Sequence, residues 1–226
     1  AGQIASPDLA PPASLPAVRE QELRCACKAY GIHPPIFLDY LDGQLTIVNQ
    51  GQAVGKLVRI IRQIRPQVMI TFGPDGIYGH YDHLAVHRWA TAAYDLAADA
   101  ECFPDRDPCE THQVSKLYYR VTPQEALDAR IAAGQRTAVP MDGVPFPFVG
   151  YPIREIDAIV DVGAYVEAKR QGILCHATQV GIENRYAQAP EEVLADRWFR
   201  EETYLLARST VGRMDGVEGD LLAGLK

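Results

Sequence analysis

Apolar residues follow two alternating patterns along the first half of the chain, one typical of helices and one of buried strands. Helical spacing of apolar side chains predicts helices over residues 16–30, 54–64 and 82–97, and the middle one is the most clearly amphipathic. Short apolar runs at 36–40 and 68–72 predict strands, because turn residues follow each of them. Strands that alternate with helices indicate a parallel sheet with right-handed crossovers.

The second half of the chain continues this alternation. We expect strands at 116–121 and 155–162, helices at 123–133 and 164–175, and a last helix and strand within 191–208. The predicted fold is α/β, a Rossmann-like, doubly wound and mostly parallel sheet with helices on both faces. One domain is expected over residues 1–208, followed by a flexible, glycine-rich tail over 209–226.

The stretch 139–152 contains too many prolines for regular structure and is predicted to be a long loop. Long loops in compact domains often form lids or the walls of binding sites. Its aromatic residues Phe146, Phe148 and Tyr151 are therefore expected to shape a substrate entrance, with the covering of a core edge as the alternative.

Composition and charge narrow the class of protein. Hydrophobic residues make up 47% of the 226 residues, which is enough for the core of one large domain. The net charge of -7 argues against non-specific binding to nucleic acid or to an anionic membrane. No apolar stretch reaches the length of a membrane span, and the first residues lack the pattern of a signal peptide. We therefore expect a cytoplasmic protein.

The five cysteines do not predict a disulfide framework or a structural zinc site, because their number is odd and no CxxC spacing recurs. Cys25 and Cys27 fall on the helix at 16–30 and are expected to be small residues in or near the core. Cys102 and Cys109 flank a loop and would pair in a secreted protein, whereas an intracellular chain would keep them reduced.

Polar and titratable side chains gather in the turn that follows the strand at 68–72. Tyr78, His80, Asp82 and His83 stand between that strand and the next helix, where open parallel sheets usually bind ligands. Imidazole is the commonest protein ligand for zinc, so a metal site is one interpretation. The alternative is that Asp82 caps the helix, His80 is a loop residue, and His83 forms a solvated face with His87.

The run GPDGIYGHYDHLAVHR resembles a signature of the LmbE-like family of zinc-dependent de-N-acetylases, which includes the N-acetylglucosaminyl-phosphatidylinositol enzymes. Three further stretches are similar to that family. They are Arg19 and Glu22 with Gly31, FLDYLDGQL at 37–45, and the span 161–179 with a histidine before a glutamine. The resemblance covers most of residues 1–180, and the run GPDGIYGHYDHLAVHR, which follows the strand predicted at 68–72, is its most specific part.

The resemblance implies roles for individual residues. His83 would bind Zn²⁺, His80 would stabilise or protonate the reacting amide, Asp82 would orient His80, and Tyr78 would lie beside the developing oxyanion. On the substrate side it implies Arg19, Asp42 and His176. Each of these three also has a plain structural interpretation: a surface ion pair with Glu22, a turn residue, and a histidine favoured by a helix dipole.

The family's first signature, a His-Pro-Asp-Asp type motif, does not occur in this sequence. In the family it supplies two zinc ligands and the carboxylate that acts as general base. The resemblance therefore predicts that a strand, a helix and a second strand, on the order of 35 residues, are missing before Ala1. The expected consequence is a copy that binds zinc poorly and is inactive as it stands, either truncated or a natural short form.

These observations favour a zinc-dependent hydrolase that removes an acetyl group from a small N-acetylated glycosidic substrate. A degenerate paralogue that binds a sugar or a partner without catalysis is the first alternative. A metal-dependent phosphoester hydrolase is the second, although few candidate ligands cluster for two metals. A homo-oligomer is possible, and the sequence does not decide the oligomeric state.

Overall fold

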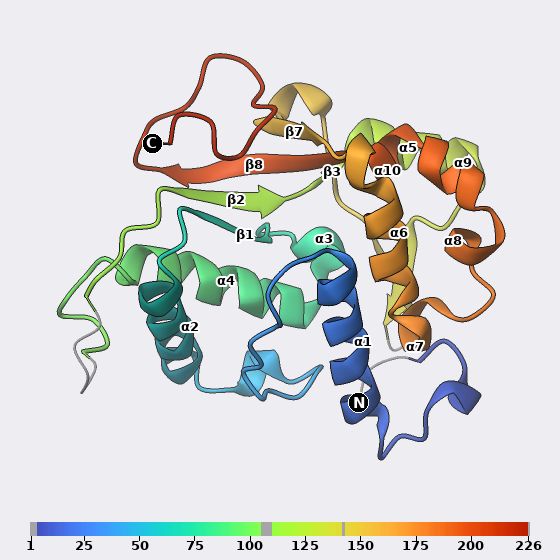
Figure 1. The fold of residues 1–226 in the computed structure, drawn as a ribbon, viewed down its shortest axis with the longest axis horizontal. Helices are drawn as coiled ribbons and strands as arrows, with labels where there is room; N and C mark the ends of the chain where they lie inside the picture. Colours follow the sequence, from blue (N-terminus) through green and yellow to red (C-terminus); the bar gives the residue numbers. More distant parts are fainter. Residues whose placement is uncertain (1–3, 105–109, 142, 226) are drawn as a thin grey trace. The chain divides into compact units, whose positions relative to one another are not determined.

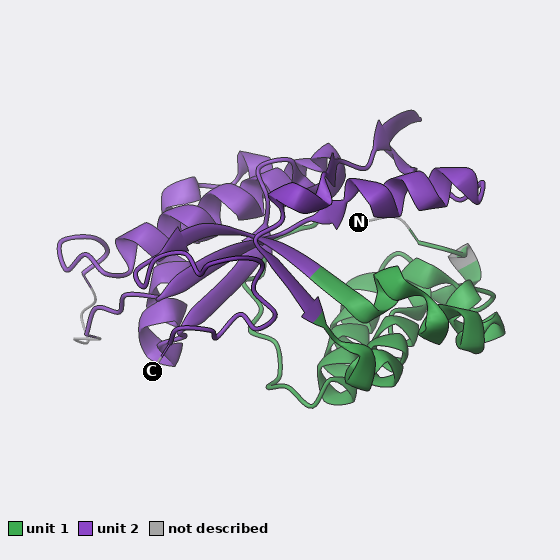
Figure 2. Ribbon diagram, turned by 90° about the horizontal axis from the view of Figure 1, so that it is seen from above, with its two compact units in different colours: residues 1–43, 161–202 green, residues 44–160, 203–226 purple. Residues whose placement is uncertain are grey.

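The computed structural model describes residues 4–104, 110–141 and 143–225, and the chain divides into two compact units. One unit combines residues 1–43 with 161–202, and the other combines 44–160 with 203–226 (Figure 2). Each unit therefore takes segments from distant parts of the sequence. The single domain predicted over residues 1–208 stays a prediction.

The larger unit is built on a four-stranded sheet with the strand order β1-β2-β8-β7 (Figure 1). β1 and β2 are parallel, whereas β8 runs antiparallel to β2, so the sheet is mixed. The α/β class is confirmed. Two strands, β7 and β8, cross the boundary between the units. The elements of the larger unit are η2 Leu45–Ile47, α2 Gln50–Ile64, β1 Val68–Phe72, α3 Gly76–Gly79, α4 Tyr81–Leu96, β2 Lys116–Arg120, β3 Thr122–Pro123, α5 Gln124–Ala132, β4 Ala138–Met141, β5 Val144–Pro147, β6 Gly150–Tyr151, η3 Ile153–Glu155, β7 Ala158–Asp161 and β8 Glu201–Ser209.

The predicted helix, strand and helix over residues 54–97 are confirmed as α2, β1 and α4. α4 packs against β1 and α2 packs against α4, which places the apolar face of each helix in the interior. The core of the sheet contains Tyr118, Ala158, Tyr204 and Leu206. Among the described residues, no helix is long and apolar enough to cross a membrane.

The C-terminal segment, predicted as a flexible tail, contributes a buried carboxylate to this core. Glu218 is 6% exposed and pairs with Lys116 at 2.8 Å, and Lys116 itself is completely buried. The backbone of Glu218 also bonds to Asp157 and Ile159 beside β7. A side chain far along the chain therefore completes the interior of the sheet.

The prediction of an irregular loop at 139–152 is wrong. β4 and β5 form a two-stranded antiparallel ribbon in which Pro140 lies opposite Pro145, and β6 pairs with β3. A two-stranded ribbon leaves half of the N–H groups of each strand facing outward, so a proline at such a position costs no ladder hydrogen bond.

A buried arginine that the sequence did not single out closes the C-terminal end of α4. Arg62 on α2 is 4% exposed, and its guanidinium donates to five backbone carbonyls, those of Leu96, Ala97, Asp99, Cys102 and Phe103. The last carbonyls of a helix have no partners within it, so an external donor is needed when they are buried.

We expect Arg62→Lys to lower the free energy of unfolding by about 2 kcal/mol, because an ammonium cannot reach this spread of acceptors and leaves some of them unsatisfied. Urea denaturation measures the effect. Arg59→Lys, at an exposed position on the same helix, is the control and should change stability by less than about 0.5 kcal/mol. Equal stability of the two variants would show that the fold does not need the buried guanidinium of Arg62.

The smaller unit is helical. Its elements are η1 Pro7–Leu9, α1 Leu15–Ala29, η4 Gly163–Tyr165, α6 Val166–Leu174, α7 Ala177–Val180, α8 Arg185–Gln188, α9 Pro190–Ala195 and α10 Arg197–Arg200. α1 packs against α6, and Val166, Val193 and Phe199 form a core cluster. The helices predicted at 16–30 and 164–175 are confirmed.

The strand predicted at 36–40 is wrong. All five of these residues are described, and none has regular structure. Ile36 is 58% exposed and Phe37 is 38% exposed, so the run is not buried on both faces. An apolar run becomes a strand when a neighbouring strand supplies its hydrogen bonds, and the sheets of the described residues supply none here.

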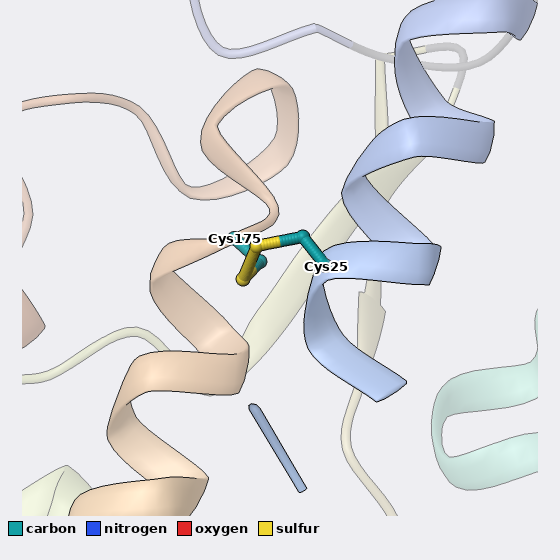
Figure 3. Close-up of a disulfide and its surroundings, with 2 residues drawn as sticks. All are labelled: Cys25 and Cys175. Atoms are coloured by element: carbon teal, nitrogen blue, oxygen red, sulfur yellow. A yellow bond between two sulfur atoms is a disulfide. The ribbon is translucent and has the colours of Figure 1, made fainter. Parts of the chain in front are cut away.

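The interpretation of Cys25 as simply a small residue in or near the core is corrected. Cys25 on α1 is bonded to Cys175 at the end of α6 (Figure 3). The two cysteines are 150 positions apart, and spacing along the chain carries no information about such a pair. Cys27 and Cys102 are free, and Cys109 lies outside the described residues. The predicted cytoplasmic location stays a prediction.

Candidate active site

The turn after β1, which we call the elbow (residues 73–83), is shaped by backbone conformations that require particular residues. Gly76 has φ +60°, and a Cβ atom there would lie 3.1 Å from Cβ of His83, so a larger residue would be both strained and crowded. Ile77 follows with φ 70° and ψ -42°. A β-branched residue at positive φ costs roughly 1–3 kcal/mol and persists where the surroundings hold it.

Within the elbow, the two histidine rings lie close together. The ring centroids of His80 and His83 are 4.8 Å apart, and both side chains are half-buried. The ring of Tyr78 meets the edge of each, at 5.8 Å from His80 and 5.3 Å from His83. The structure therefore brings together the residues that the sequence predicted to act at this turn.

The hydrogen bonds of the two histidines fix opposite tautomers. Nδ1 of His83 is 3.0 Å from the carbonyl oxygen of Gly76, and a carbonyl can only accept, so Nδ1 donates and, in the neutral ring, Nε2 carries the lone pair. Nδ1 of His80 accepts from the backbone N–H of Asp82 at 3.2 Å, so its proton is on Nε2. One ring thus presents an acceptor nitrogen and the other a donor.

Further contacts hold these rings in place. Phe72, the last residue of β1, stacks on His83 with the ring centroids 4.0 Å apart and the planes within 5°. His87, one turn along α4, bonds through Nδ1 to the carbonyl oxygen of Phe72 at 3.0 Å. The alternative that His83 and His87 form a solvated face is therefore wrong, because both rings face the strand.

Asp82 is 5% exposed, and its carboxylate accepts from the backbone N–H of Leu45 at 3.0 Å. The contact that the structure shows between Asp82 and His80 runs through the backbone of Asp82. The orienting role of its carboxylate stays a prediction. Sequence patterns did not point to Leu45, because the bond joins residues far apart in the chain.

The aromatic residues predicted to shape an entrance lie against the elbow. Phe148 meets Tyr78 with the ring centroids 5.7 Å apart, and Phe146 meets Tyr81 at 6.3 Å. The hydroxyl of Tyr151 donates to Asp75 at 2.6 Å. Asp75 looked like an ordinary turn residue in the sequence, and the acidic side chain at an N-cap position was the one available signal.

The predicted substrate-side residues belong to the smaller unit. Arg19 on α1 is half-buried, with Nε 3.5 Å from the hydroxyl of Thr178. Glu22 is 7% exposed and accepts from the backbone N–H and the hydroxyl of Thr178 at 2.7 and 2.6 Å, so it is a buried residue and not a solvated surface charge.

Asp42 and His176, the other two substrate-side predictions, have separate surroundings in the smaller unit. Asp42 is exposed in a turn, as its alternative predicted. His176 is the N-cap residue of α7 and follows the bridged Cys175. The binding roles of both stay predictions.

The donor set of the described residues does not fit a complete zinc site. A catalytic zinc takes three protein ligands, and within the described ranges no group of three His, Cys, Asp or Glu side chains is placed to hold a metal. Within the elbow, His83 is oriented as a ligating histidine usually is, with a carbonyl on its other nitrogen.

Comparison with known proteins identifies a matching family and several sequence relatives. Residues 1–94 match the family described as GlcNAc-PI de-N-acetylase (PIG-L). A 1D-myo-inositol 2-acetamido-2-deoxy-alpha-D-glucopyranoside deacetylase of Rhodococcus jostii is 36% identical over 178 residues, which are 75% of this chain and 58% of the relative. The chain thus spans less than two thirds of that relative. The enzyme of the same name from Mycobacterium leprae is 33% identical over 230 residues, 90% of this chain and 75% of the relative.

Solved structures agree on the fold. The N,N'-diacetylchitobiose deacetylase of Pyrococcus horikoshii has a TM-score of 0.59 at 15% identity, covering 86% of this chain and 64% of that one. A 4-carboxy-2-hydroxymuconate hydratase of Pseudomonas putida has the same TM-score at 17% identity, covering 89% and 76%. Because this fold is shared by a deacetylase and a hydratase, it does not by itself indicate the reaction. The sequence relatives decide the family, and the chain belongs to the GlcNAc-PI de-N-acetylase (PIG-L) family.

Proposed function

We propose that the protein is a hydrolase that removes the acetyl group from a small 2-acetamido-2-deoxyglucoside. Family membership and the names of the sequence relatives support this substrate class. The observation that carries the proposal is the pair of imidazoles in the elbow, His80 with its proton on Nε2 and His83 with its lone pair on Nε2.

The reaction breaks the C–N bond of the acetamide, forms a C–O bond from water, and releases acetate and a free amine. His80 can contribute at two points. Its Nε2–H stabilises the negative charge that develops on the amide oxygen. The same nitrogen can pass its proton to the leaving amine while it takes up the proton that the attacking water loses, so the neutral ring is restored. We assign a contact with the same oxygen to Tyr78, and its ring contacts with both histidines support this assignment.

Zinc at His83 stays a prediction of the resemblance, and we assign no step to a metal because the described donor set is incomplete. The prediction is testable by metal analysis. In the protein expressed from its complete reading frame, His83→Gln should lower bound zinc per chain at least tenfold, because one of few nitrogen ligands is lost. His87→Gln, on the same helix, is the matched control and should keep the zinc.

The direct test of the function is an assay of the same protein with 1D-myo-inositol 2-acetamido-2-deoxy-α-D-glucopyranoside and with N-acetylglucosamine. Equal amounts of acetate and free amine are expected, with faster release from the glycoside. Stoichiometric binding of the sugar without release of acetate would favour the non-catalytic alternative. Hydrolysis of a phosphoester in place of the amide would contradict the proposal.

A further inference from the structure

The segment 146–151, which we call the strap, is fastened to the elbow by two hydrogen bonds. The hydroxyl of Tyr151 donates to Oδ2 of Asp75 at 2.6 Å. Two residues back along the strap, the backbone N–H of Val149 donates to the carbonyl oxygen of Ile77 at 2.8 Å. From Tyr151 back to Val149 on the strap, the partner on the elbow changes from Asp75 forward to Ile77.

Aromatic contacts continue this register. Phe148 meets the ring of Tyr78, and Phe146 meets the ring of Tyr81. The two segments thus run antiparallel and touch at successive positions from the first turn of the elbow to the start of α4. These contacts hold the elbow against the strap over this length.

The conformation held in this way is that of Ile77. Its N–H donates to Oδ1 of Asp75 at 2.6 Å, and its carbonyl accepts from Val149, so both of its backbone groups lead to the strap. Isoleucine does not adopt φ 70° unless its surroundings impose it. The direction in which the chain leaves Ile77 decides where Tyr78 and His80 stand.

We infer that Tyr151 is a positioning residue for the reaction, acting through Asp75 and Ile77 to set the places of Tyr78 and His80. This inference rests on the proposed function. Asp75 holds the strap with one oxygen and the elbow with the other, so the hydroxyl of Tyr151 orients the carboxylate that fixes the turn. Burial and the bond to Asp75 raise the pKa of Tyr151, so its hydroxyl keeps the donated proton at neutral pH.

Kinetics of Tyr151→Phe in the protein expressed from its complete reading frame test the role in catalysis. We expect kcat to fall about tenfold and KM to change by less than about twofold, because the loss of one hydrogen bond misplaces reacting groups without removing a substrate contact. Tyr119→Phe is the control, since it loses a bond of similar burial to Thr91 outside the strap. It should keep kcat within about twofold of the parent.

Ile77→Gly separates positioning from a general loss of stability. Glycine adopts positive φ without strain, so the turn needs less support from the strap. The effect of Tyr151→Phe on kcat should therefore shrink from about tenfold to about threefold or less in the Ile77→Gly background. Effects of equal size in both backgrounds would overturn the inference.

Amide hydrogen exchange in the 226-residue chain gives a readout that does not depend on activity. Tyr151→Phe should speed exchange at Ile77 and Val149 about tenfold, and Tyr119→Phe should not. Unchanged exchange at Ile77 would overturn the inference whatever the kinetics. Faster exchange in a protein that hydrolyses no acetamide would instead contradict the proposed function and leave the contact of strap and elbow in place.

Discussion

Replacing His80 by asparagine is expected to lower kcat for acetate release by about 10²- to 10⁴-fold, the range that a positioned general acid contributes. His80 has two functions in the elbow, and asparagine retains one of them. The side chain of His80 caps α4 by accepting from the N–H of Asp82, and asparagine is also a favourable N-cap residue. An amide cannot transfer a proton as an imidazole does, so the proton on Nε2 is lost while the cap remains.

The measurement is kcat and KM on the glycoside, together with the midpoint of urea denaturation. His87→Gln is the control, because His87 is half-buried like His80 but lies within α4 and bonds to the carbonyl oxygen of Phe72. We expect the control to retain activity within about threefold. If His80→Asn keeps the parent kcat at unchanged stability, His80 is not the proton donor and the proposed mechanism is wrong.

The second large effect concerns stability. Lys116→Met is expected to lower the free energy of unfolding by about 3–5 kcal/mol, because it removes the cation from a buried ion pair. Nζ of Lys116 lies 2.8 Å from Oε2 of Glu218 and 3.1 Å from the hydroxyl of Tyr118, and all three side chains are buried. Burial and the bond to Glu218 raise the pKa of Tyr118, so the hydroxyl stays a donor to the carboxylate.

A double variant identifies the cause of this loss. Glu218→Gln added to Lys116→Met removes the buried negative charge and leaves an amide that can still accept from Tyr118. We expect it to recover at least half of the lost stability, since the cost comes from the unpaired charge more than from the lost attraction. Urea denaturation of the four chains gives the coupling. If the double variant loses as much free energy of unfolding as the two single variants together, the loss comes from packing and not from the unpaired charge.

Local sequence predicted the elements that form the elbow, but it could not predict the residues from distant segments that contact it. Hydrophobic spacing predicted α2, β1 and α4, and the glycines after β1 predicted the sharp turn. The partners of that turn come from distant segments: Leu45 on Asp82, and Tyr151 on Asp75. Nothing in the spacing of residues encodes such pairs, because they depend on which segments the fold brings together.

The same distinction explains the corrections. Residues 36–40 have the composition of a strand, but a strand is defined by a neighbour, and none pairs with them among the described residues. The prolines of 139–152 would break a central strand, yet they are accommodated in a two-stranded ribbon whose outward N–H positions need no partner. In both cases the pairing, and not the run of residues, decided the structure.

By itself, the sequence determined the order of helices and strands around β1, the sharp turn after it and the four polar residues in that turn, because each depends on neighbours a few positions away. The tertiary structure decided the tautomers of His80 and His83, the buried pair of Lys116 with Glu218, and the bond of Cys25 to Cys175. A side chain's hydrogen bonds and charge partners are set by whatever lies across the space it faces, and only the folded chain supplies those groups.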